Sequence, residues 1–377
     1  MPVAQPSTLR VPYTDFSVQF EAQRDEILGA LTGVLRRGDF ILGRDVEQFE
    51  QEFAALCGVK HAIGVASGTD ALVLGLKSLG IGPGDEVITP PNSWISSTSS
   101  IALSGARPVF ADVTDDFTID PADIERKITP RTKAIMPVHL TGRCAPMDAI
   151  LAIARRRGLA VIEDAAQAAG ARFNDTPAGS FGAIACFSLH PLKTLGGLGD
   201  GGLIVTNDDE AARRLRLLRN HGLQSRDEII TWGFNSRLDT LQAAVLRLRL
   251  KRLREAVEAR RRHAARYRSL ISSAVTCPRD DRSGEYSAYH LFMIQCDARD
   301  ALQKFLAGRG IDTKIHYPTP IHLQPCSASL GGRPGDHPVA EAQAQRILSL
   351  PIHEYLSDEQ IDYAAQMMLE FYQERRA

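Results

Sequence analysis

Residues 159–167, LAVIEDAAQ, and residues 187–202, FSLHPLKTLGGLGDGG, are the two most informative stretches of this chain. The first is an apolar run that ends in Glu163 and Asp164, which is typical of a buried strand with a carboxylate at its carboxyl end. Open α/β sheets bind ligands at that edge, so we expect Asp164 at a ligand site. The second stretch places a single lysine, Lys193, in a mostly neutral, glycine-rich loop.

Around these stretches, short apolar runs alternate with helical patterns from about residue 60 to residue 206. We expect strands at residues 61–66, 85–89, 107–113, 133–138, 160–164, 185–189 and 202–206. We expect helices at residues 69–79, 95–104, 121–127 and 147–157, with Asp120 as the N-cap of the third. This alternation predicts βαβ units and a mainly parallel sheet with helices on both faces, the three-layer α/β/α class.

The rest of the chain predicts a second, smaller α+β region. Residues 237–270 contain neither Pro nor Gly and carry apolar residues at helical spacing, so they predict one long helix. Beyond it we expect a strand at residues 289–295, helices at 298–306 and 340–349, and a loop rich in Pro, Gly and His at 316–338. We divide the chain into an N-terminal arm (1–30), a large domain (31–250) and a small C-terminal domain (251–377).

The composition is that of a balanced globular protein. The 377 residues are 44% hydrophobic and carry a formal net charge of -1, so the arginines of residues 247–262 indicate a solvated helix face rather than nucleic-acid binding. The six scattered cysteines contain no C-x-x-C pair and indicate reduced thiols. No apolar stretch is long enough to cross a bilayer, and residues 1–7 lack the pattern of a signal peptide. We therefore expect a cytoplasmic protein with no membrane or nucleic-acid partner.

Lys193 and Asp164 supply the two groups that pyridoxal phosphate requires. An amine forms a Schiff base with the cofactor, and a carboxylate keeps the pyridine nitrogen protonated so that the ring accepts electrons. Gln167 follows Asp164 at a spacing that lets it reach the adjacent ring hydroxyl. Taken singly, a solvated lysine and a helix-capping aspartate are commoner explanations, but the neutral flanks of Lys193 argue against the first.

Three further positions fit the remaining parts of such a cofactor. In residues 64–72, GVASGTDAL, a strand meets a turn that opens a helix, where N–H groups bind phosphate and Gly68 admits close approach of the anion. Ser188 would add a hydroxyl, and Trp94 would stack on a flat ring. The simpler alternatives are helix capping by Ser67 or Thr69 and a core position for Trp94. Residues 197–202 match G-x-G-x-x-G but precede a strand, so no dinucleotide site is expected.

Two later segments carry other candidates. Asn235 stands just before the long helix, where helix capping is the simpler explanation. Residues 316–326, HYPTPIHLQPC, place His316, His322 and Cys326 at a spacing that fits no compact zinc pattern. We therefore expect no metal there and instead a loop that faces the substrate, with contacts from His316, Tyr317 and His322.

Taken together, these motifs resemble the DegT/DnrJ/EryC1/StrS sugar aminotransferases, fold-type-I enzymes of amino-sugar biosynthesis that use pyridoxal phosphate. The resemblance runs from about residue 39 to the C-terminus. It rests on the order S-G-T-D-A-L, P-x-N-x-W, E-D-A-A-Q, F-S-x-H-P-x-K, G-D-G-G, N-x-R-L-D-x-x-Q-A-A and H-Y-P-x-P-x-H. It implies a large domain with a mainly parallel seven-stranded sheet and a smaller α+β domain at the C-terminus.

The resemblance also implies a role for each motif. Lys193 would carry the cofactor, and Asp164 would pair with its ring nitrogen. Asn235 would reach across a dimer interface to the phosphate of the neighbouring subunit, so that a homodimer would share its active sites. The other implied cofactor contacts are Gly68, Thr69, Trp94, Gln167 and Ser188.

The reaction follows from the same resemblance. An amino acid, glutamate in most members, would leave its nitrogen on the cofactor as pyridoxamine phosphate, and a keto sugar linked to a nucleoside diphosphate would then take it. Lys193 stands where one subgroup has a histidine and performs dehydration, which argues for amino transfer. The loop ending G-D-G-G is similar to that of members that aminate C3, whereas those that aminate C4 more often show E-G-G. Two alternatives stay open, a cyclitol ketone as the acceptor and a regulator without catalysis that binds a sugar nucleotide.

Overall fold

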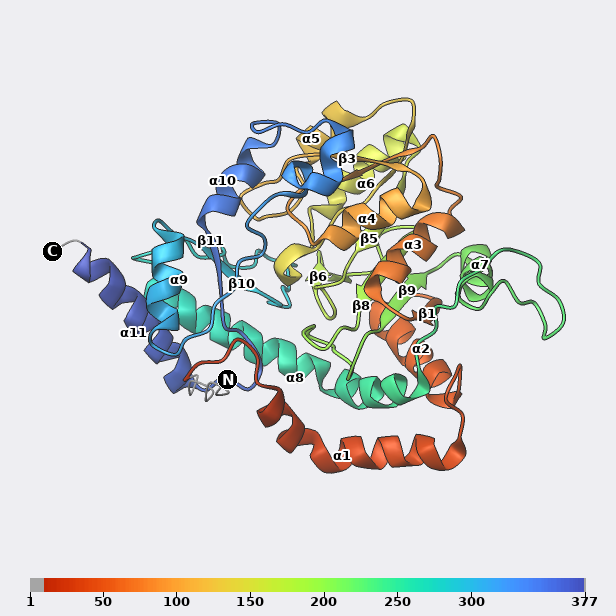
Figure 1. Ribbon diagram of the computed structural model, residues 1–377, viewed down its shortest axis with the longest axis horizontal. Coiled ribbons are helices and arrows are strands. Elements are labelled where there is room, and N and C mark those ends of the chain that lie inside the picture. The colour runs from red at the N-terminus through yellow and green to blue at the C-terminus, as the bar shows by residue number, and fades with distance from the viewer. Residues whose placement is uncertain (1–9, 376–377) are drawn as a thin grey trace, which may run out of the picture.

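A seven-stranded sheet forms the centre of the protein (Figure 1). The computed structural model describes residues 10–375. The strand order is β1-β9-β8-β5-β4-β2-β3, and β9 runs antiparallel to both of its neighbours while the other neighbouring strands are parallel. The predicted mainly parallel seven-stranded sheet is therefore confirmed. Its strands are β1 (His61–Val65), β2 (Glu86–Thr89), β3 (Arg107–Phe110), β4 (Thr132–Ile135), β5 (Ala160–Asp164), β8 (Ile184–Ser188) and β9 (Gly202–Thr206).

Helices cover both faces of this sheet, and the period-two alternation of its side chains decides which helix packs where. On β9, Leu203 and Val205 join one core cluster with Phe49 and Leu246, whereas Ile204 joins the opposite cluster. The first cluster packs α2 (Arg44–Cys57) and α8 (Thr240–Ile271) on one face. The second packs α3 (Gly68–Ser78) and α7 (Asp209–Arg219) on the other. The remaining sheet helices are α4 (Ile95–Ser104), α5 (Pro121–Lys127) and α6 (Met147–Arg157).

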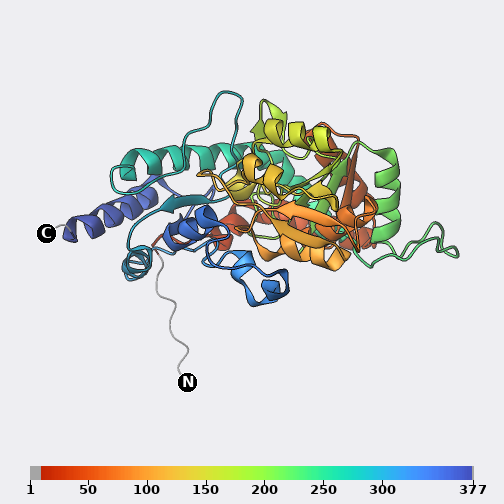
Figure 2. The ribbon, with the colours of Figure 1, turned by 90° about the horizontal axis from the view of Figure 1, so that it is seen from above.

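Helix α8 leads from the sheet into the smaller α+β region (Figures 1 and 2). There, β10 (Phe292–Gln295) pairs antiparallel with β11 (Ile347–Leu350). A separate core cluster packs this two-stranded sheet against α9 (Arg299–Ala307), α11 (Asp358–Glu374) and the end of α8. Shorter elements are η1 (Leu140–Gly142), β6 (Arg172–Phe173), β7 (Thr176–Pro177), η2 (Ile321–Leu323), η3 (Pro325–Leu330) and α10 (Pro338–Arg346).

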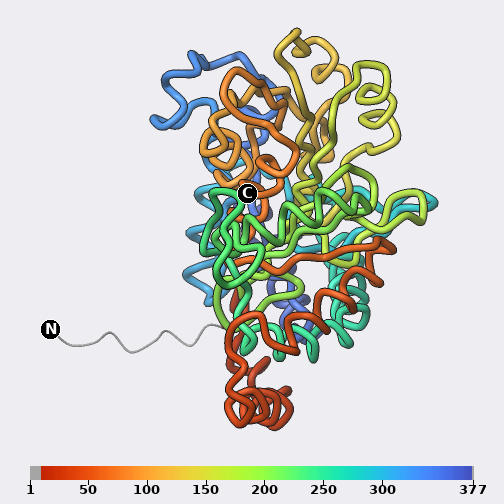
Figure 3. The backbone as a smooth tube through the Cα atoms, turned by 90° about the vertical axis from the view of Figure 1, so that its right-hand side faces the viewer, coloured from red at the N-terminus to blue at the C-terminus, as the bar shows by residue number. Residues whose placement is uncertain are grey.

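Helix α1 (Phe16–Arg37) lies along α8 at the edge of the molecule (Figures 1 and 3). It extends across residue 30, where the sequence analysis ends the N-terminal arm, and α8 extends across residue 250. The division into three parts stays a prediction. The first nine residues of the arm, which include the segment judged for a signal peptide, lie outside the described residues. Within residues 10–375, no helix combines the length and apolarity that a membrane crossing requires.

Several predicted boundaries are wrong. The helix expected at 340–349 ends at Arg346, because Ile347 turns to extended backbone (φ -72°, ψ 139°) and the apolar residues that follow pair with β10. The strand expected from residue 289 starts at Phe292, since Tyr289 has a positive φ of 45°. The strands expected at 107–113 and 133–138 end at Phe110 and Ile135. The long helix starts at Thr240 rather than at residue 237.

Candidate active site

Asp164 ends β5 as a buried carboxylate surrounded by neutral donors. The Ser97 hydroxyl donates to Asp164 Oδ2 at 2.6 Å, and the N–H of Ala166 donates to Oδ1 at 3.2 Å. Its exposed fraction is 4%. Burial raises the pKa of Asp164, while these hydrogen bonds and the nearby Lys193 act in the opposite direction. A carboxylate in this setting is stabilised by a cationic group that arrives beside it.

Lys193 lies in a tight loop between β8 and β9. The Lys193 N–H donates to the His190 carbonyl at 2.8 Å, and the Gly197 N–H donates to the Leu189 carbonyl at 2.7 Å. Burial lowers the pKa of Lys193 to about 8, against the opposing pull of the Asp164 carboxylate. A substantial fraction of the amine is therefore neutral near pH 7 to 8, which is the form that attacks a carbonyl.

The start of α3 forms a setting suited to an anion. Ser67 is the N-cap, and its hydroxyl accepts from the Asp70 N–H at 3.0 Å, so the simpler explanation, helix capping, holds for Ser67 rather than for Thr69. The Thr69 hydroxyl instead lies 2.8 Å from the hydroxyl of Ser96. A Cβ on Gly68 would stand 2.8 Å from the Ser188 Cβ, so the helix start and the end of β8 are in close contact. The structure thus brings Gly68, Thr69 and Ser188 together where free N–H groups favour a phosphate.

Trp94 and Gln167 come from neighbouring loops. Trp94 precedes α4, is 57% exposed, and its ring centroid lies 5.5 Å from that of Tyr317. A core position for Trp94 is thereby wrong. Gln167 is buried, and its Oε1 accepts from the Thr141 N–H at 2.7 Å, which fixes the orientation of the amide.

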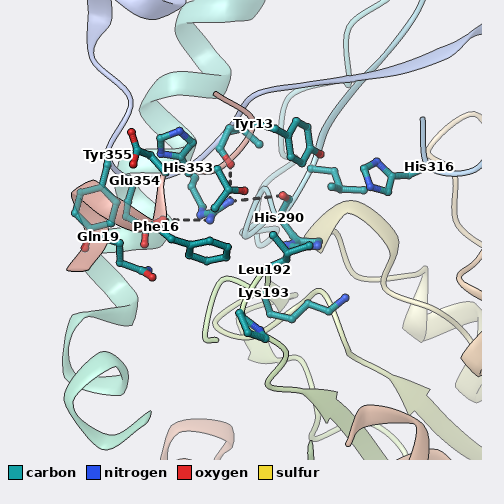
Figure 4. A pocket seen from close by; sticks show the side chains of 16 residues that line it. Tyr13, Phe16, Gln19, Leu192, Lys193, His290, His316, His353, Glu354 and Tyr355 are labelled. Atoms are coloured by element: carbon teal, nitrogen blue, oxygen red, sulfur yellow. Dashed lines mark hydrogen bonds and ion pairs between the residues drawn. The ribbon is translucent and has the colours of Figure 1, made fainter. Parts of the chain in front are cut away.

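A cavity of about 60 Å³ opens beside Lys193 (Figure 4). Its lining includes Tyr13, His290 and His316, which come from three distant parts of the chain. His316 Nδ1 lies 2.9 Å from the Ser349 hydroxyl, and burial next to Lys193 lowers the pKa of His316 to about 4. Burial also lowers the pKa of His290 well below its usual range. Both imidazoles are therefore neutral at pH 7 and present a polar, uncharged wall to the cavity.

Of the predicted site residues, Lys193 and His316 line this cavity, and the others lie outside its lining, namely Gly68, Thr69, Trp94, Asp164, Gln167, Ser188, Asn235, Tyr317 and His322. His322 is buried elsewhere: its Nε2 lies 3.0 Å from Glu341 Oε1, and its ring packs on His337 at a centroid distance of 4.6 Å. Asn235 is exposed, in the segment after α7 that projects from the molecule (Figure 2). Neither residue lines the cavity beside Lys193. Within residues 10–375, no cluster of three or more His, Cys, Asp or Glu side chains could hold a metal ion.

Three site residues were not predicted from the sequence, namely Ser97, Tyr13 and His290. Ser97 had a signal, because residues 96–100, SSTSS, are a hydroxyl run in a helix that is otherwise apolar, and buried hydroxyls need partners. Tyr13 and His290 had none. Tyr13 precedes α1 and His290 precedes β10, so only the folding of the α+β region brings them to Lys193.

Comparison with known proteins agrees with this geometry. A profile of the DegT/DnrJ/EryC1/StrS aminotransferase family matches residues 21–369. The chain is 46% identical, over 93% of each sequence, to dTDP-3-amino-3,4,6-trideoxy-alpha-D-glucose transaminase of Streptomyces venezuelae. It is 45% identical, over 97% of its length and 99% of the relative's, to a pleiotropic regulatory protein of Geobacillus stearothermophilus.

A solved structure of a sugar aminotransferase is similar to this chain over nearly its whole length. The crystal structure of DesV from S. venezuelae, in complex with a ketimine intermediate, superposes with a TM-score of 0.94 at 44% identity. The superposition covers 97% of this chain and 99% of that one. The chain therefore belongs to the DegT/DnrJ/EryC1/StrS aminotransferase family.

Proposed function

We propose that the protein is a pyridoxal phosphate-dependent aminotransferase that moves an amino group from L-glutamate to C3 of a keto sugar linked to a nucleoside diphosphate. The observation that carries this proposal is the pairing of Lys193, whose pKa is lowered to about 8, with the buried carboxylate of Asp164. The Streptomyces relative, named as a transaminase of a dTDP-3-amino sugar, supports both the acceptor class and the carbon. The G-D-G-G ending at Gly199–Gly202 points to the same carbon.

The residues present fit the cofactor. Asp164 accepts hydrogen bonds only from a hydroxyl and a backbone N–H, which suits a protonated ring nitrogen as its missing cationic partner. The start of α3, with Gly68 and Thr69, and the Ser188 hydroxyl would hold the phosphate. Trp94 is exposed enough to stack on the ring, and Gln167 would face its hydroxyl. When bound, pyridoxal phosphate supplies an electron sink for a carbanion at the donor's α-carbon.

Lys193 performs the proton transfers. Its neutral Nζ takes the proton from the donor's α-carbon in the first half-reaction, and in the second it returns a proton to the sugar carbon that receives the nitrogen. A pKa near neutrality suits both directions, because the same group must accept and release a proton. The buried Asp164 carboxylate would stabilise positive charge at the ring nitrogen of the bound cofactor. The neutral imidazole of His316 lines the cavity, where the acceptor would enter, and the ring of Tyr317 lies against Trp94.

We further propose a homodimer in which Asn235 reaches the phosphate of the neighbouring subunit. The segment around Asn235 exposes large apolar side chains, including Ile229 (64% exposed) and Trp232 (94% exposed). Exposed apolar side chains that lie close together mark a surface for interaction with another protein. The turn before α2 adds Phe40 and Ile41, each nearly half exposed. These apolar surfaces suit burial against a second copy. We also expect a cytoplasmic location, where the six free cysteines stay reduced, and no nucleic-acid partner.

The test is amino transfer to a panel of acceptors. The purified enzyme, supplied with pyridoxal phosphate and L-glutamate, should aminate 3-keto sugars linked to dTDP or UDP and leave the matched 4-keto sugars unchanged, as followed by mass spectrometry. Turnover of the 4-keto sugars alone would overturn the assignment to C3. Turnover of a cyclitol ketone alone would replace the nucleotide sugar as acceptor.

A second candidate, regulation without catalysis, is favoured by the name of the Geobacillus relative. The intact pair of Lys193 and Asp164 counts against it, because a regulator has no use for an amine of lowered pKa beside a buried carboxylate. Binding of a nucleotide sugar without any turnover, by protein that holds pyridoxal phosphate, would favour this candidate over the enzyme.

A further inference from the structure

Arg249 is a buried cation that forms no ion pair with any carboxylate of residues 10–375, although the charge of Glu354 acts on it from farther away. It lies on α8 with an exposed fraction of 9%. Its Nη1 donates to the carbonyls of Gly196 at 2.5 Å and Gly197 at 3.1 Å. Its Nε donates to Gln23 Oε1 at 3.2 Å, and its Nη2 to Gln19 Oε1 at 3.1 Å. Four neutral oxygens therefore surround the guanidinium, two from the lysine loop and two from α1.

The neighbouring arginines of α8 differ in this respect. Arg247 pairs with Asp45 and Glu52, and Arg252 pairs with Glu26 of α1 at 2.5 Å. Burial lowers the pKa of Arg249, yet a guanidinium keeps its charge in a protein. A buried charge without a counter-ion is costly, so its hydrogen bonds must be well formed. Charge-assisted bonds to carbonyls are about twice as strong as neutral ones and fix the direction of each acceptor.

The two carbonyls belong to the loop that carries Lys193. Gly196 lies three residues after Lys193, and a Cβ on it would stand 2.5 Å from the Pro191 carbonyl, so the loop folds tightly back on itself. Because the loop is this compact, a displacement of Gly196 would also displace Lys193. By holding the carbonyls of Gly196 and Gly197, Arg249 therefore fixes the direction in which the Lys193 side chain leaves the loop.

The glutamines join the same anchor to the wall of the active-site cavity. Gln19 itself lines the cavity beside Lys193 (Figure 4). The Gln23 amide donates to the Tyr355 hydroxyl at 2.8 Å, and Tyr355 lines that cavity as well. One guanidinium thus ties together the lysine loop, the first turns of α1 and the segment before α11.

We propose that Arg249 is a positioning residue for Lys193: it holds the lysine loop through Gly196 and Gly197 and so sets how the amine meets the cofactor's aldehyde. The inference rests on the proposed function, because it concerns the bond that Lys193 forms with pyridoxal phosphate. It goes beyond that function in assigning a role to a residue that does not line the cavity beside Lys193. Gln19 and Gln23 complete the anchor from the side of α1.

The test compares Arg249→Met with Arg252→Met in the full-length chain. Both changes remove an arginine that bridges α8 and α1, but Arg252 contacts Glu26 and not the lysine loop. The measurement is the affinity for pyridoxal phosphate, which bonds to Lys193, beside that for pyridoxamine phosphate, which does not. In Arg249→Met we expect pyridoxal phosphate to bind at least about tenfold more weakly and pyridoxamine phosphate to change by less than about threefold. Arg252→Met should match the wild type for both.

A second readout follows the amine itself. Competitive acylation of Lys193 in the cofactor-free chain, quantified by mass spectrometry over pH, reports its pKa. The Lys193 charge interacts with Asp164, His290 and His316. The other charged and titratable side chains that line the cavity with it are Tyr13, Asp15, Arg260, His353, Glu354 and Tyr355, and none of these groups changes in the variant. A loosened loop admits water to the amine, so the pKa should rise from about 8 toward the ordinary 10.5 in Arg249→Met.

Equal weakening of both cofactor forms, or an effect that Arg252→Met reproduces, would overturn the proposal. If Arg249→Met does not fold, Arg249→Lys replaces it, because an ammonium keeps the charge but cannot span the loop carbonyls and both glutamines. The failure of the proposed function looks different. Wild-type protein would then bind both cofactor forms equally, and Lys193→Ala would leave both affinities unchanged.

Discussion

At the scale of single residues, burial and mutual attraction act in opposite directions on the protonation of Lys193 and Asp164. Burial pushes both toward their neutral forms, lowering the pKa of the lysine and raising that of the aspartate. Each charge opposes the shift of the other. The balance leaves an amine that exchanges protons near pH 8 beside a carboxylate that stays available to a cation.

Asp164→Asn tests the carboxylate. The amide keeps the shape and can still bond to Ser97, but it cannot stabilise a protonated ring nitrogen. We expect the rate of the glutamate half-reaction to fall roughly a hundredfold, the scale of one lost electrostatic partner in a water-excluded site. Single-turnover absorbance measures this rate, with the exposed Asp115→Asn as the control. A rate within twofold of the wild type would show that the carboxylate does not serve the ring nitrogen.

The pH dependence of cofactor capture tests the lysine. Only the neutral amine attacks an aldehyde, so protonation below the pKa of Lys193 should slow capture of pyridoxal phosphate. The rate, followed by stopped-flow absorbance, should rise with pH through about 8 and then level off. A rate that still climbs toward pH 10.5, as for an ordinary lysine, would contradict the lowered pKa.

At the scale of elements, the start of α3 packs so closely against the end of β8 that no side chain fits between them. Gly68 has no side chain where a Cβ would stand 2.8 Å from that of Ser188. The contact places the free N–H groups of the helix start next to the Ser188 hydroxyl. It is the packing of two elements, rather than either residue alone, that creates the proposed phosphate position.

Gly68→Ala should separate these elements. We expect the free energy of unfolding to fall by about 1 to 3 kcal/mol, the usual cost of overpacking, and inorganic phosphate to compete less well with the cofactor. Gly29→Ala is the matched control, since it lies in α1 with nothing within 4 Å of the new methyl group. A helix alanine in open space should stabilise slightly, by up to about 1 kcal/mol. Thermal unfolding and phosphate titration of both variants check this, and equal behaviour would refute the close contact.

Much of the large domain could be predicted because its signals are local. Each apolar run or helical pattern is contained in a short stretch of sequence, and the sheet strands form at the predicted apolar runs. The strand β11 was missed because its pairing is not local: Ile347–Leu350 is an apolar run after a helical pattern, and only β10, far back in the sequence, makes it a strand. Helices α1, α2, α7 and α11 are absent from the sequence prediction, although Ser357 and Gln360 form a capping box at the start of α11.

The site divides in the same way. Asp164 lies at a strand end, Gly68 at a helix start and Lys193 in a glycine-rich loop, and the chemistry of each can be inferred from its neighbours in sequence. Tyr13 and His290 reach the cavity only through the packing of the α+β region. His322 resembled a substrate contact in its motif, but its partner Glu341 lies on α10, so the pairing could not be inferred from residues 316–326.

At the scale of the whole molecule, the projecting segment after α7 bears on whether a single chain forms a complete active site. It exposes Trp232 almost completely, and Asn235 is exposed as well. A two-fold symmetric dimer would bury the same surface on both subunits and place each Asn235 against the other subunit. The active sites would then be complete only in the dimer.

Subunit complementation tests this sharing. Lys193→Ala and Asn235→Ala subunits should each be nearly inactive alone. Mixed and allowed to exchange, they should recover about one quarter of wild-type activity, because half of the dimers are mixed and each mixed dimer has one intact site. Recovery near zero, with exchange proven by tagged subunits, would mean that Asn235 and Lys193 serve the same chain.

The most direct measurement is borohydride reduction of the protein supplied with pyridoxal phosphate, before and after L-glutamate, followed by peptide mapping. Before glutamate, reduction should attach the cofactor to Lys193 and remove the absorbance band at the edge of the visible range. After glutamate, the cofactor should be in its amine form and reduction should attach none of it. Attachment to another lysine, or a band that no amino acid alters, would contradict an aminotransferase centred on Lys193.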